Sequence, residues 1–410
     1  MKIIVQKFGG TSVRDENGRE LAYKHIQNAL SEGYKVVVVV SAMGRKGEPY
    51  ATDTLLSLVG GNQALLSKRE LDMLMSCGEL ISSVVFTNLL NSHGIRAAAL
   101  NGAQAGFLTN SDFNSAKIIE MRCDRLVEEL ERHDVVVVAG FQGATEQGDT
   151  TTLGRGGSDT SASALGAALN AEFIDIFTDV EGVMTADPRI VEDARPLSVV
   201  TYNEICNMAY QGAKVIHPRA VEIAMQAKVP IRVRSTYSES EGTLVTSQAN
   251  AKQRGSDVQE RLITGIAHVS GVTQIKVFAK EGHYDLQAEV FKAMANEQIS
   301  VDFINISPKG VVYTVTNDVT DKAVGVLREL GYEPVVTREC AKVSTVGAGM
   351  TGMPGVAAKI VGALSEQGIQ ILQSADSHTT IWVLVKEEDL KKAVNALHDA
   401  FELSKAGNEY

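Results

Sequence analysis

Charged side chains stand beside glycines at several places in this sequence, a combination typical of anion-binding sites. The first string, Lys7-Phe8-Gly9-Gly10, directly follows a short apolar run, Ile3 to Val5. Glycines let the backbone approach a phosphate closely, and successive backbone N–H groups can form an anion-binding nest. Lys7 would add a full positive charge, although it precedes the glycines and so does not fit the Walker pattern. A glycine pair alone more often marks a tight turn.

A second glycine-rich string, Gly154-Arg155-Gly156-Gly157-Ser158-Asp159, opens a predicted helix. The guanidinium of Arg155 is a fork of donors that matches a carboxylate bidentately, and we expect this arginine to be buried. Asp159 either belongs to the same site or only favours the helix N-terminus through the helix dipole. The string therefore predicts a second anion site, with an arginine whose donors match a carboxylate.

Further candidates lie in two loops and one helix. Arg189, in the loop that follows Thr178-Asp179, and Lys214 are available for phosphate. His217 precedes a proline, and a hydrogen-bonded histidine at a helix start is the simpler interpretation of it than catalysis. Glu79 lies within an apolar helix, where a lone carboxylate must have a partner.

The elements that must position these residues alternate between strands and helices. The valine runs Val36 to Val40 and Val135 to Val138 both end at glycine-containing turns, which is typical of strands buried on both faces. Alternation of strand and helix predicts an α/β fold with a mainly parallel sheet sandwiched by helices, in which ligands bind beyond the carboxyl ends of the strands. The expected helices are Leu21 to Leu30, Glu70 to Asn91, Ala116 to Arg132, Ser158 to Ala168 and Arg219 to Ala227.

A weak internal repeat follows a polar linker in the C-terminal part. Residues 290–299 resemble residues 360–369, and each copy belongs to a strand–helix–strand–strand–helix–strand order that fits a ferredoxin-like βαββαβ unit. Chance similarity of two amphipathic helices is the alternative. The expected division is a catalytic domain at 1–246, a linker at 247–261, a first unit at 262–339 and a second unit at 340–410.

The segment Val346 to Gly352 contains Gly-x-Gly-x-x-Gly, with Asp376 downstream, and so resembles a dinucleotide fingerprint. Too little chain follows it for a doubly wound domain. The repeat explains the same residues as a strand, a glycine turn and a helix start, which we prefer.

Bulk composition excludes several classes of protein. The chain has 410 residues, a length that predicts two or three domains, and its formal net charge of −11 comes without any basic run, so nucleic acid is not an expected partner. Its four cysteines are scattered without metal-ligand spacing, as in a reducing compartment. We see no signal peptide and no apolar stretch long enough to span a bilayer, and expect a cytoplasmic enzyme with no membrane partner.

Together these strings resemble the aspartokinase family, within the wider amino acid kinase fold. The resemblance runs from Lys7 to Val13 through Gly154 to Asp159, Thr178 to Arg189 and Gly212 to Pro218, and continues into the repeat, which resembles a pair of ACT units. The nearest type is the bacterial isozyme regulated by meso-diaminopimelate. The family implies ATP-dependent phosphorylation of the side-chain carboxylate of L-aspartate, with Mg²⁺, as the first step of lysine and diaminopimelate, threonine and methionine biosynthesis. No protein-ligated metal or permanently bound cofactor is implied.

The resemblance also implies residue roles. The ATP phosphates and the transferring group would be held by Lys7, Phe8, Gly9, Gly10, Ser41 and Lys214, with Asp159 orienting the lysines. The rest of the nucleotide would meet Thr178, Asp179, Met184, Asp187 and Arg189. Aspartate would be bound by Thr52, Glu79, Arg155, Gly156, Gly157 and Ser158: Arg155 on its α-carboxylate and Glu79 on its ammonium group.

Two departures from the family pattern affect these roles. Met184 stands where many members carry an aromatic residue, which puts the contact with the nucleotide in doubt. The loop Arg45 to Ala51 is lengthened, so Thr54 competes with Thr52 for the substrate contact.

The ACT pair implies an allosteric amino acid, such as lysine, threonine or meso-diaminopimelate, bound near Asp302, Asn305 and the segment Gly282 to Gln287, and a homo-oligomer. A pair that only dimerises is the alternative. A glutamate kinase and a non-catalytic amino-acid sensor are the competing functions. The joint presence of Lys7, Asp159 and Lys214 argues against the sensor.

Overall fold

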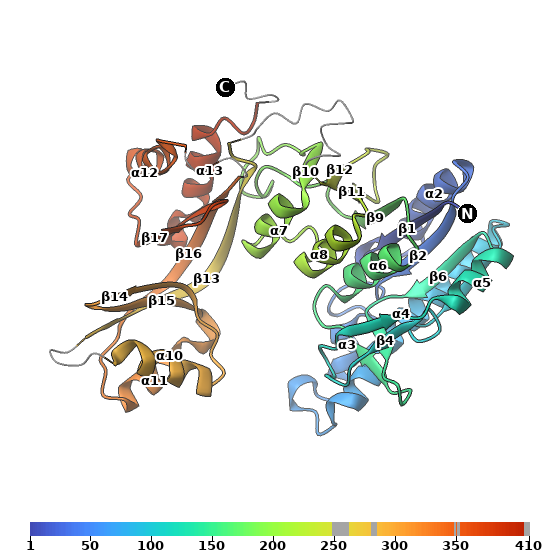
Figure 1. The fold of residues 1–410 in the computed structure, drawn as a ribbon, viewed down its shortest axis with the longest axis horizontal. Helices are drawn as coiled ribbons and strands as arrows, with labels where there is room; N and C mark the ends of the chain where they lie inside the picture. Colours follow the sequence, from blue (N-terminus) through green and yellow to red (C-terminus); the bar gives the residue numbers. More distant parts are fainter. Residues whose placement is uncertain (248–261, 280–284, 348–349, 351–352, 406–410) are drawn as a thin grey trace. The chain divides into compact units, whose positions relative to one another are not determined.

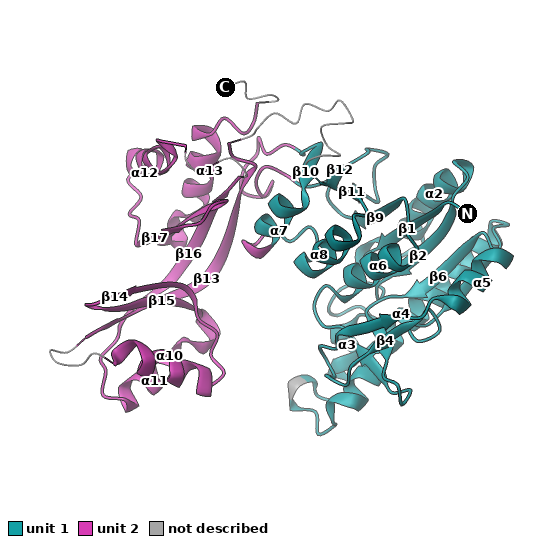
Figure 2. Ribbon diagram, viewed as in Figure 1, with its two compact units in different colours: residues 1–183, 196–209, 214–258 teal, residues 184–195, 210–213, 259–410 magenta. Residues whose placement is uncertain are grey.

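A computed structural model describes residues 1–247, 262–279, 285–347, 350 and 353–405. The chain forms two compact units, shown in Figure 2. Unit 1 contains residues 1–183, 196–209 and 214–258, and unit 2 contains residues 184–195, 210–213 and 259–410. Almost all of the expected linker, and part of the segment Gly282 to Gln287, lie outside the described residues.

Unit 1 is built on an eight-stranded sheet that is mainly parallel, as expected, with only the β11–β12 pair antiparallel. In spatial order its strands are β10 (Val199–Thr201), β12 (Thr243–Thr246), β11 (Ile231–Ser235), β9 (Phe173–Thr178), β1 (Ile3–Phe8), β2 (Lys35–Val40), β6 (Val135–Ala139) and β3 (Ala97–Leu100). The two valine runs are neighbours, β2 and β6, and are buried throughout except at Lys35.

Helices cover both faces of this sheet (Figure 1). On one face α2 and α4 pack on alternate residues of β1, β2 and β6, forming a core that includes Phe8, Ile26 and Phe86. On the other face α6 packs against β1, β2 and β9, and Gly166 lies so close to Ile174 that a Cβ would clash with it. The helices of unit 1 are α1 (Gly10–Val13), α2 (Glu16–Ser31), α3 (Thr52–Ser57), η1 (Gly61–Gln63), α4 (Lys68–Ser92), α5 (Asp124–Arg132), α6 (Gly157–Ala168), α7 (Tyr202–Tyr210) and α8 (Pro218–Ala227).

The expectation of one helix from Ala116 to Arg132 is wrong in its first half. Residues Ile118–Met121 form strand β5, and the helix α5 begins only at Asp124. β5 pairs antiparallel with β4 (Phe107–Thr109) at the edge of a small second sheet, which also contains β7 (Gln142–Ala144) and β8 (Thr150–Thr152). Pairing with β4, which no local pattern reveals, overrides the helical spacing of this segment.

Helix α4 has 25 residues and, by length and composition alone, could cross a membrane, contrary to the expectation that no apolar stretch is long enough. Half of its apolar window is buried inside the protein. Its buried residues include Asp72 and Glu79, and it packs on β2, β3 and β6. It is therefore a core helix of unit 1.

Unit 2 contains a six-stranded antiparallel sheet that carries helices α10 (Leu286–Asn296), η2 (Asn317–Val319), α11 (Thr320–Glu329), α12 (Val356–Glu366), η3 (Glu387–Asp389) and α13 (Leu390–Ala400). In spatial order its strands are β14 (Asp302–Ser307), β15 (Gly310–Thr316), β13 (Gly265–Phe278), β16 (Val335–Val346), β18 (Thr380–Lys386) and β17 (Gln373–Asp376). The repeated segments form α10 and α12. The two ferredoxin-like units expected from the repeat are therefore present.

Strands β13 and β16 are long and each serves both repeats. The second half of β13 pairs with β15 and belongs to a core that contains Tyr313 and Leu327. The first half contributes Ile266 to a different core, with Val343 and Leu397. The division expected between 339 and 340 falls within β16, and the start of β13 packs with the second repeat.

Residues 184–195 belong to unit 2 and pack in its core that contains Ile266, Val343 and Leu397. Ala186 and Val191 are buried in that core. Thr185 accepts a backbone hydrogen bond from the Ile266 N–H at 2.8 Å, and its hydroxyl lies 2.9 Å from Nε2 of the buried His398. The sequence did not lead us to expect that residues 184–195 belong to unit 2.

Candidate active site

The carboxyl ends of the central strands of unit 1 lie level with one another. Phe8 is paired with Val40 on one side and with Phe177 on the other, and Val40 is paired with Ala139. The turns that follow β1, β2, β6 and β9 therefore emerge at the same edge of the sheet. This edge is where a parallel sheet binds its ligands.

The turn after β1 requires glycine for a steric reason. A Cβ on Gly10 would lie 2.7 Å from the carbonyl oxygen of Ala42 and 2.8 Å from that of Gly44, so no side chain fits. Gly10 also accepts a backbone hydrogen bond from the Gly44 N–H at 3.0 Å. The turns after β1 and β2 are thus in direct backbone contact, and Ser41 lies beside them in the lining of the cleft.

Lys7 and Asp159 form an ion pair at this edge. The Lys7 Nζ lies 2.8 Å from Oδ1 of Asp159, and both side chains are only 13% exposed. The second carboxylate oxygen of Asp159 accepts a hydrogen bond from the backbone N–H of His217 at 3.2 Å. Asp159 therefore fixes the position of Lys7. Its role is not limited to favouring the N-terminus of the helix.

His217 has the structural role that its position before a proline suggested. It precedes α8, and its Nδ1 accepts a hydrogen bond from the backbone N–H of Arg219. Its ring also lies against Gly156, where a Cβ would approach to 2.2 Å. His217 thus shapes the glycine loop that carries Arg155.

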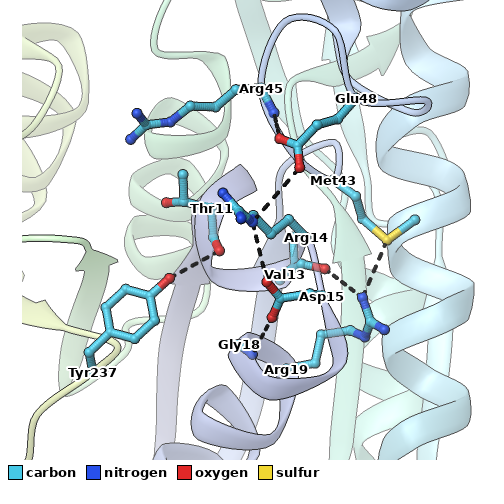
Figure 3. Close-up of polar contacts among 10 residues, drawn as sticks. All are labelled: Thr11, Val13, Arg14, Asp15, Gly18, Arg19, Met43, Arg45, Glu48 and Tyr237. Carbon is cyan, nitrogen blue, oxygen red and sulfur yellow. Dashed lines mark hydrogen bonds and ion pairs between the residues drawn. The ribbon is translucent and has the colours of Figure 1, made fainter.

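A network of polar contacts holds the outer side of the turn after β1 (Figure 3). The hydroxyl of Tyr237 donates to the carbonyl of Thr11 at 3.1 Å, and Arg19 donates to the carbonyl of Val13 at 2.8 Å. The Arg45 N–H donates to Glu48, and the Arg45 guanidinium pairs with Asp179 at 2.9 Å. Because β1 lies between β2 and β9, this last pair links the loops on either side of the glycine turn.

The loop from Gly154 to Asp159 carries Arg155 into the cleft. Gly154 and Gly156 have φ angles of +76° and +66°, which favour glycine, and the helix α6 begins at Gly157. Arg155 is exposed, contrary to the expectation of a buried arginine, and among the described residues its guanidinium has no hydrogen-bonding or ion-pairing partner. It is a cation available for an anionic ligand.

Glu79 projects from α4 into the same cleft and is only 3% exposed. Its Oε1 accepts a hydrogen bond from the backbone N–H of Ala42 at 3.1 Å, whereas Oε2 has no partner among the described residues. Burial raises the pKa of this carboxyl group to about 8. A buried carboxylate with one oxygen unsatisfied is costly in isolation and favours a cationic ligand.

These residues share one cleft of unit 1, of about 840 Å³, a volume suitable for small-molecule substrates. Of the predicted site residues, the cleft is lined by Lys7, Gly10, Ser41, Thr52, Glu79, Arg155, Gly156, Gly157, Ser158 and Asp159. Thr54, the competitor of Thr52, instead accepts a hydrogen bond from the backbone N–H of Gly47 at 3.1 Å.

Other predicted residues of unit 1 do not line this cleft. The ring of Phe8 is fully buried and stacks on Phe177 at 4.7 Å, so only its backbone could contact a nucleotide. Gly9 is the N-cap of α1. Thr178 and Asp179 follow β9, where Thr178 donates to the Asp179 carboxylate. Lys214 is exposed.

The remaining predicted nucleotide residues belong to unit 2. Met184, Asp187 and Arg189 lie in the segment 184–195 described above. The Arg189 guanidinium pairs with the Asp187 carboxylate at 2.7 Å and holds the pKa of that carboxyl below its usual range. Their nucleotide contacts remain predictions.

Sequence reasoning missed several residues of the cleft. Phe141 and Asn114 line it, and both have positive φ angles, +70° and +72°. For Phe141 a signal existed, because Gly140-Phe141-Gln142-Gly143 follows a buried strand like the other site turns. Asn114 lies in a turn without any such pattern. Lys68 and Met75 reach the cleft because they share a face of α4 with Glu79.

A metal ion would find few protein ligands here. Among the described residues no group of three or more histidine, cysteine, aspartate or glutamate side chains could hold one. Mg²⁺ in phosphoryl-transfer enzymes is bound mainly by substrate phosphates, water and one or two carboxylates. The residues present fit a metal that arrives with a nucleotide.

Comparison with known proteins shows the family of this chain. The amino acid kinase family matches residues 2–235, and an ACT domain matches residues 335–399. Aspartokinase 1 of Bacillus subtilis is 71% identical over 405 residues, which cover 99% of this chain and 100% of that protein.

Solved structures of E. coli aspartokinase III resemble the fold at 27% identity. The complex with aspartate and ADP (R-state) has a TM-score of 0.78 and covers 97% of this chain and 99% of that one. The complex with lysine and aspartate (T-state) has a TM-score of 0.76 and covers 98% and 100%. With these matches over its whole length, this chain belongs to the aspartokinase family.

Proposed function

We propose that this chain transfers the γ-phosphoryl group of ATP to the side-chain carboxylate of L-aspartate. The products are 4-phospho-L-aspartate and ADP, in the first step of lysine and diaminopimelate, threonine and methionine biosynthesis. One observation carries the proposal. A single cleft combines the Lys7–Asp159 pair beside the glycine turn with an unpaired Arg155 and the buried, half-satisfied Glu79. That set matches the charges of ATP and of an amino acid.

The aspartate end of the site consists of opposite charges. Arg155 would bind the α-carboxylate bidentately, with Ser158 and the backbone of Gly156 and Gly157 beside it. The free oxygen of Glu79 would accept a hydrogen bond from the ammonium group, which would hold that carboxyl group in its ionised form. Thr52 would contact the substrate, supported by its place in the cleft lining.

The nucleotide end would use the turn after β1. Gly9, Gly10 and the backbone of Phe8 would approach the phosphates, and Ser41 and Lys7 would contact them. Mg²⁺ bound with ATP would neutralise phosphate charge. The remaining nucleotide contacts are those implied by the family: Thr178, Asp179, Met184, Asp187, Arg189 and Lys214.

The reaction needs alignment and charge neutralisation, without a general base. An aspartate side chain has a pKa of about 4, so the nucleophile is already ionised at neutral pH. One of its oxygens attacks the γ-phosphorus as the bond to the β-phosphate oxygen breaks, and ADP leaves with those electrons. Lys7, held by Asp159, stabilises the charge on the transferring group, as is general for phosphoryl transfer.

We propose that the ACT units place this activity under the control of an amino acid. The relative crystallised with lysine supports a lysine-pathway effector, and meso-diaminopimelate or threonine are the other candidates. Asp302 and Asn305 would contact it. We also propose that the protein is cytoplasmic and forms a homo-oligomer through its ACT units. The proposed division is a catalytic domain at 1–246, a linker at 247–261 and ACT units at 262–339 and 340–410. Among the aspartokinases we assign it to the type regulated by meso-diaminopimelate.

The test is ADP release by the full-length protein with ATP and Mg²⁺, measured with aspartate and with glutamate as acceptor. The proposal predicts release that depends on aspartate, together with an acyl phosphate that hydroxylamine traps. Preference for glutamate, or release that requires neither amino acid, would overturn it. Adding lysine, threonine or meso-diaminopimelate singly then identifies the effector.

A further inference from the structure

A second buried carboxylate, Asp72, lies on α4 seven residues before Glu79 and has no place in the mechanism above. Its side chain is fully buried, and burial raises the pKa of its carboxyl group. It nevertheless accepts several hydrogen bonds. The backbone N–H of Asn114 lies 3.0 Å from both of its oxygens, the backbone N–H of Thr152 donates at 2.8 Å and the Thr152 hydroxyl donates at 2.7 Å.

These donors belong to the two segments that support the arginine loop. Thr152 ends β8, three residues before Arg155. Asn114 lies at the turn against which that loop packs, since a Cβ on Gly154 would lie 3.3 Å from the Asn114 carbonyl oxygen. The Ala116 N–H also donates to the Thr152 carbonyl at 2.8 Å. Asp72 thus joins both segments through one carboxylate.

Arg219 of α8 holds the same two segments through their carbonyl groups. Its guanidinium donates to the carbonyl of Leu153 at 3.1 Å and to that of Ala116 at 3.3 Å. The two segments are therefore held together by an anion that accepts from an N–H group of each and by a cation that donates to a carbonyl group of each. The Arg155 side chain itself has no hydrogen-bonding or ion-pairing partner among the described residues, so its access to the cleft depends on the backbone that carries it.

We infer that Asp72 is a positioning residue for substrate recognition, acting through the backbone that carries Arg155 and not through contact with the substrate. The inference rests on the proposed role of Arg155 at the α-carboxylate. In Asp72→Asn an amide NH₂ would face backbone N–H donors, so the two segments would separate. A displaced Arg155 would bind the α-carboxylate less well in the ground state and in the transition state alike, which raises KM and leaves kcat unchanged.

The experiment is a double-mutant cycle on the full-length protein, with steady-state kinetics for both substrates. We expect Asp72→Asn to raise the KM for aspartate at least about tenfold, while the KM for ATP and kcat at saturating aspartate stay within about twofold. If Asp72 acts through Arg155, Asp72→Asn/Arg155→Ala has the same KM for aspartate as Arg155→Ala alone. A product of the two single effects overturns the inference.

A milder pair of variants covers the case in which Asp72→Asn does not fold. Thr152→Val removes one hydroxyl donor to Asp72, and Thr152→Ser retains it. We expect a higher KM for aspartate in the valine variant and a value near wild type in the serine variant. Equal behaviour of the two overturns the inference.

Asp175→Asn is the matched control, since Asp175 is equally buried but pairs with Arg232 within the main sheet. It should lower Tm without a selective change in the KM for aspartate. A selective rise in the control would show that burial alone causes the effect and would overturn the inference. Absence of aspartate-dependent turnover in the wild-type protein would overturn the proposed function and this inference with it, whereas additivity in an active enzyme overturns the inference alone.

Discussion

Two carboxylates, one in each unit, were predicted to bind an amino acid, and they differ in what already satisfies them. Glu79 in unit 1 is 3% exposed and has one oxygen without a partner among the described residues. Asp302 in unit 2 is paired with Lys342 at 2.5 Å, with side-chain exposures of 69% and 10%. At the site predicted around Glu79 a ligand would supply the missing partner, whereas at the site predicted around Asp302 a ligand would have to replace Lys342.

The difference suggests two modes of recognition. Ionising this half-satisfied, buried carboxyl group is costly, and a substrate ammonium group would offset that cost, which favours specificity. The Asp302 end of the second pair is largely solvated, so opening this pair costs less than breaking a fully buried one, and the open and closed forms lie closer in energy. Close energies are what an amino acid needs to shift a conformational equilibrium.

The largest effect should come from Lys7→Ala, which removes the cation at the transferring group. We expect kcat to fall at least about 10²–10³-fold, because fixed charge at the site of charge development is worth that much in other enzymes. Circular dichroism should show an intact fold. Lys2→Ala, which removes an exposed pair with Glu172 near the start of the same strand, is the control and should retain turnover. Wild-type-like turnover of Lys7→Ala would contradict the assignment.

The next effect should come from Glu79→Gln. Loss of a charge-assisted hydrogen bond of about 1.5–3 kcal/mol predicts a KM for aspartate raised about 10- to 100-fold. The substrate-free protein should be no less stable near neutral pH, because the raised pKa leaves Glu79 largely protonated there and the amide is a neutral group of similar shape. Thermal unfolding and kinetics measured together test this. Glu70→Gln, which alters an exposed carboxylate of the same helix that pairs with Arg69, should change neither quantity appreciably. A clear loss of stability in Glu79→Gln would indicate a structural role instead.

The pH dependence of the free energy of unfolding should reveal the titration of Glu79. With a pKa of about 8 in the folded protein and about 4.3 when unfolded, Glu79 binds a proton more readily in the folded state. Its contribution to the free energy of unfolding is therefore complete below about pH 4 and is lost as the pH rises through about 8. Denaturant titrations from pH 5 to 8 should give a slope in wild type that is reduced in Glu79→Gln by at most about 1.4 kcal/mol per pH unit. Identical slopes would contradict the raised pKa.

In the absence of effector, Lys342→Met should have the smallest effect on turnover and stability. We expect basal turnover within about twofold of wild type and a stability change of about 1 kcal/mol or less, since the pair is largely exposed on the Asp302 side. The response to the effector should change, because Lys342 no longer competes with the effector for Asp302. Lys322→Met, which removes an exposed pair with Glu297, is a control on the same unit. An unchanged response would exclude Asp302 from effector binding.

The sequence predicted the parts of the site whose chemistry is local. Gly10, Ser41 and Arg155 could be predicted from the glycine turns that follow buried strands. Close backbone approach and left-handed φ angles both favour glycine, so such turns are visible in the sequence. The alternation of elements likewise predicted the parallel sheet, and the repeat predicted both ACT units.

What the sequence did not reveal depends on contacts distant along the chain. Asp72 is an ordinary residue of an apolar helix until Thr152 and Asn114 fold against it. Strand β5 exists because β4 pairs with it, and residues 184–195 join unit 2 through packing on Ile266 and His398 that no local pattern encodes.

We propose that the unpaired oxygen of Glu79 recognises the ammonium group of aspartate, and a substrate without that group tests this contact directly. ADP release should be measured with aspartate and with succinate, which lacks that group, in wild type and in Glu79→Gln. We expect wild type to prefer aspartate strongly in kcat/KM, and this preference to disappear almost completely in Glu79→Gln. A preference of the same size in both proteins would contradict it.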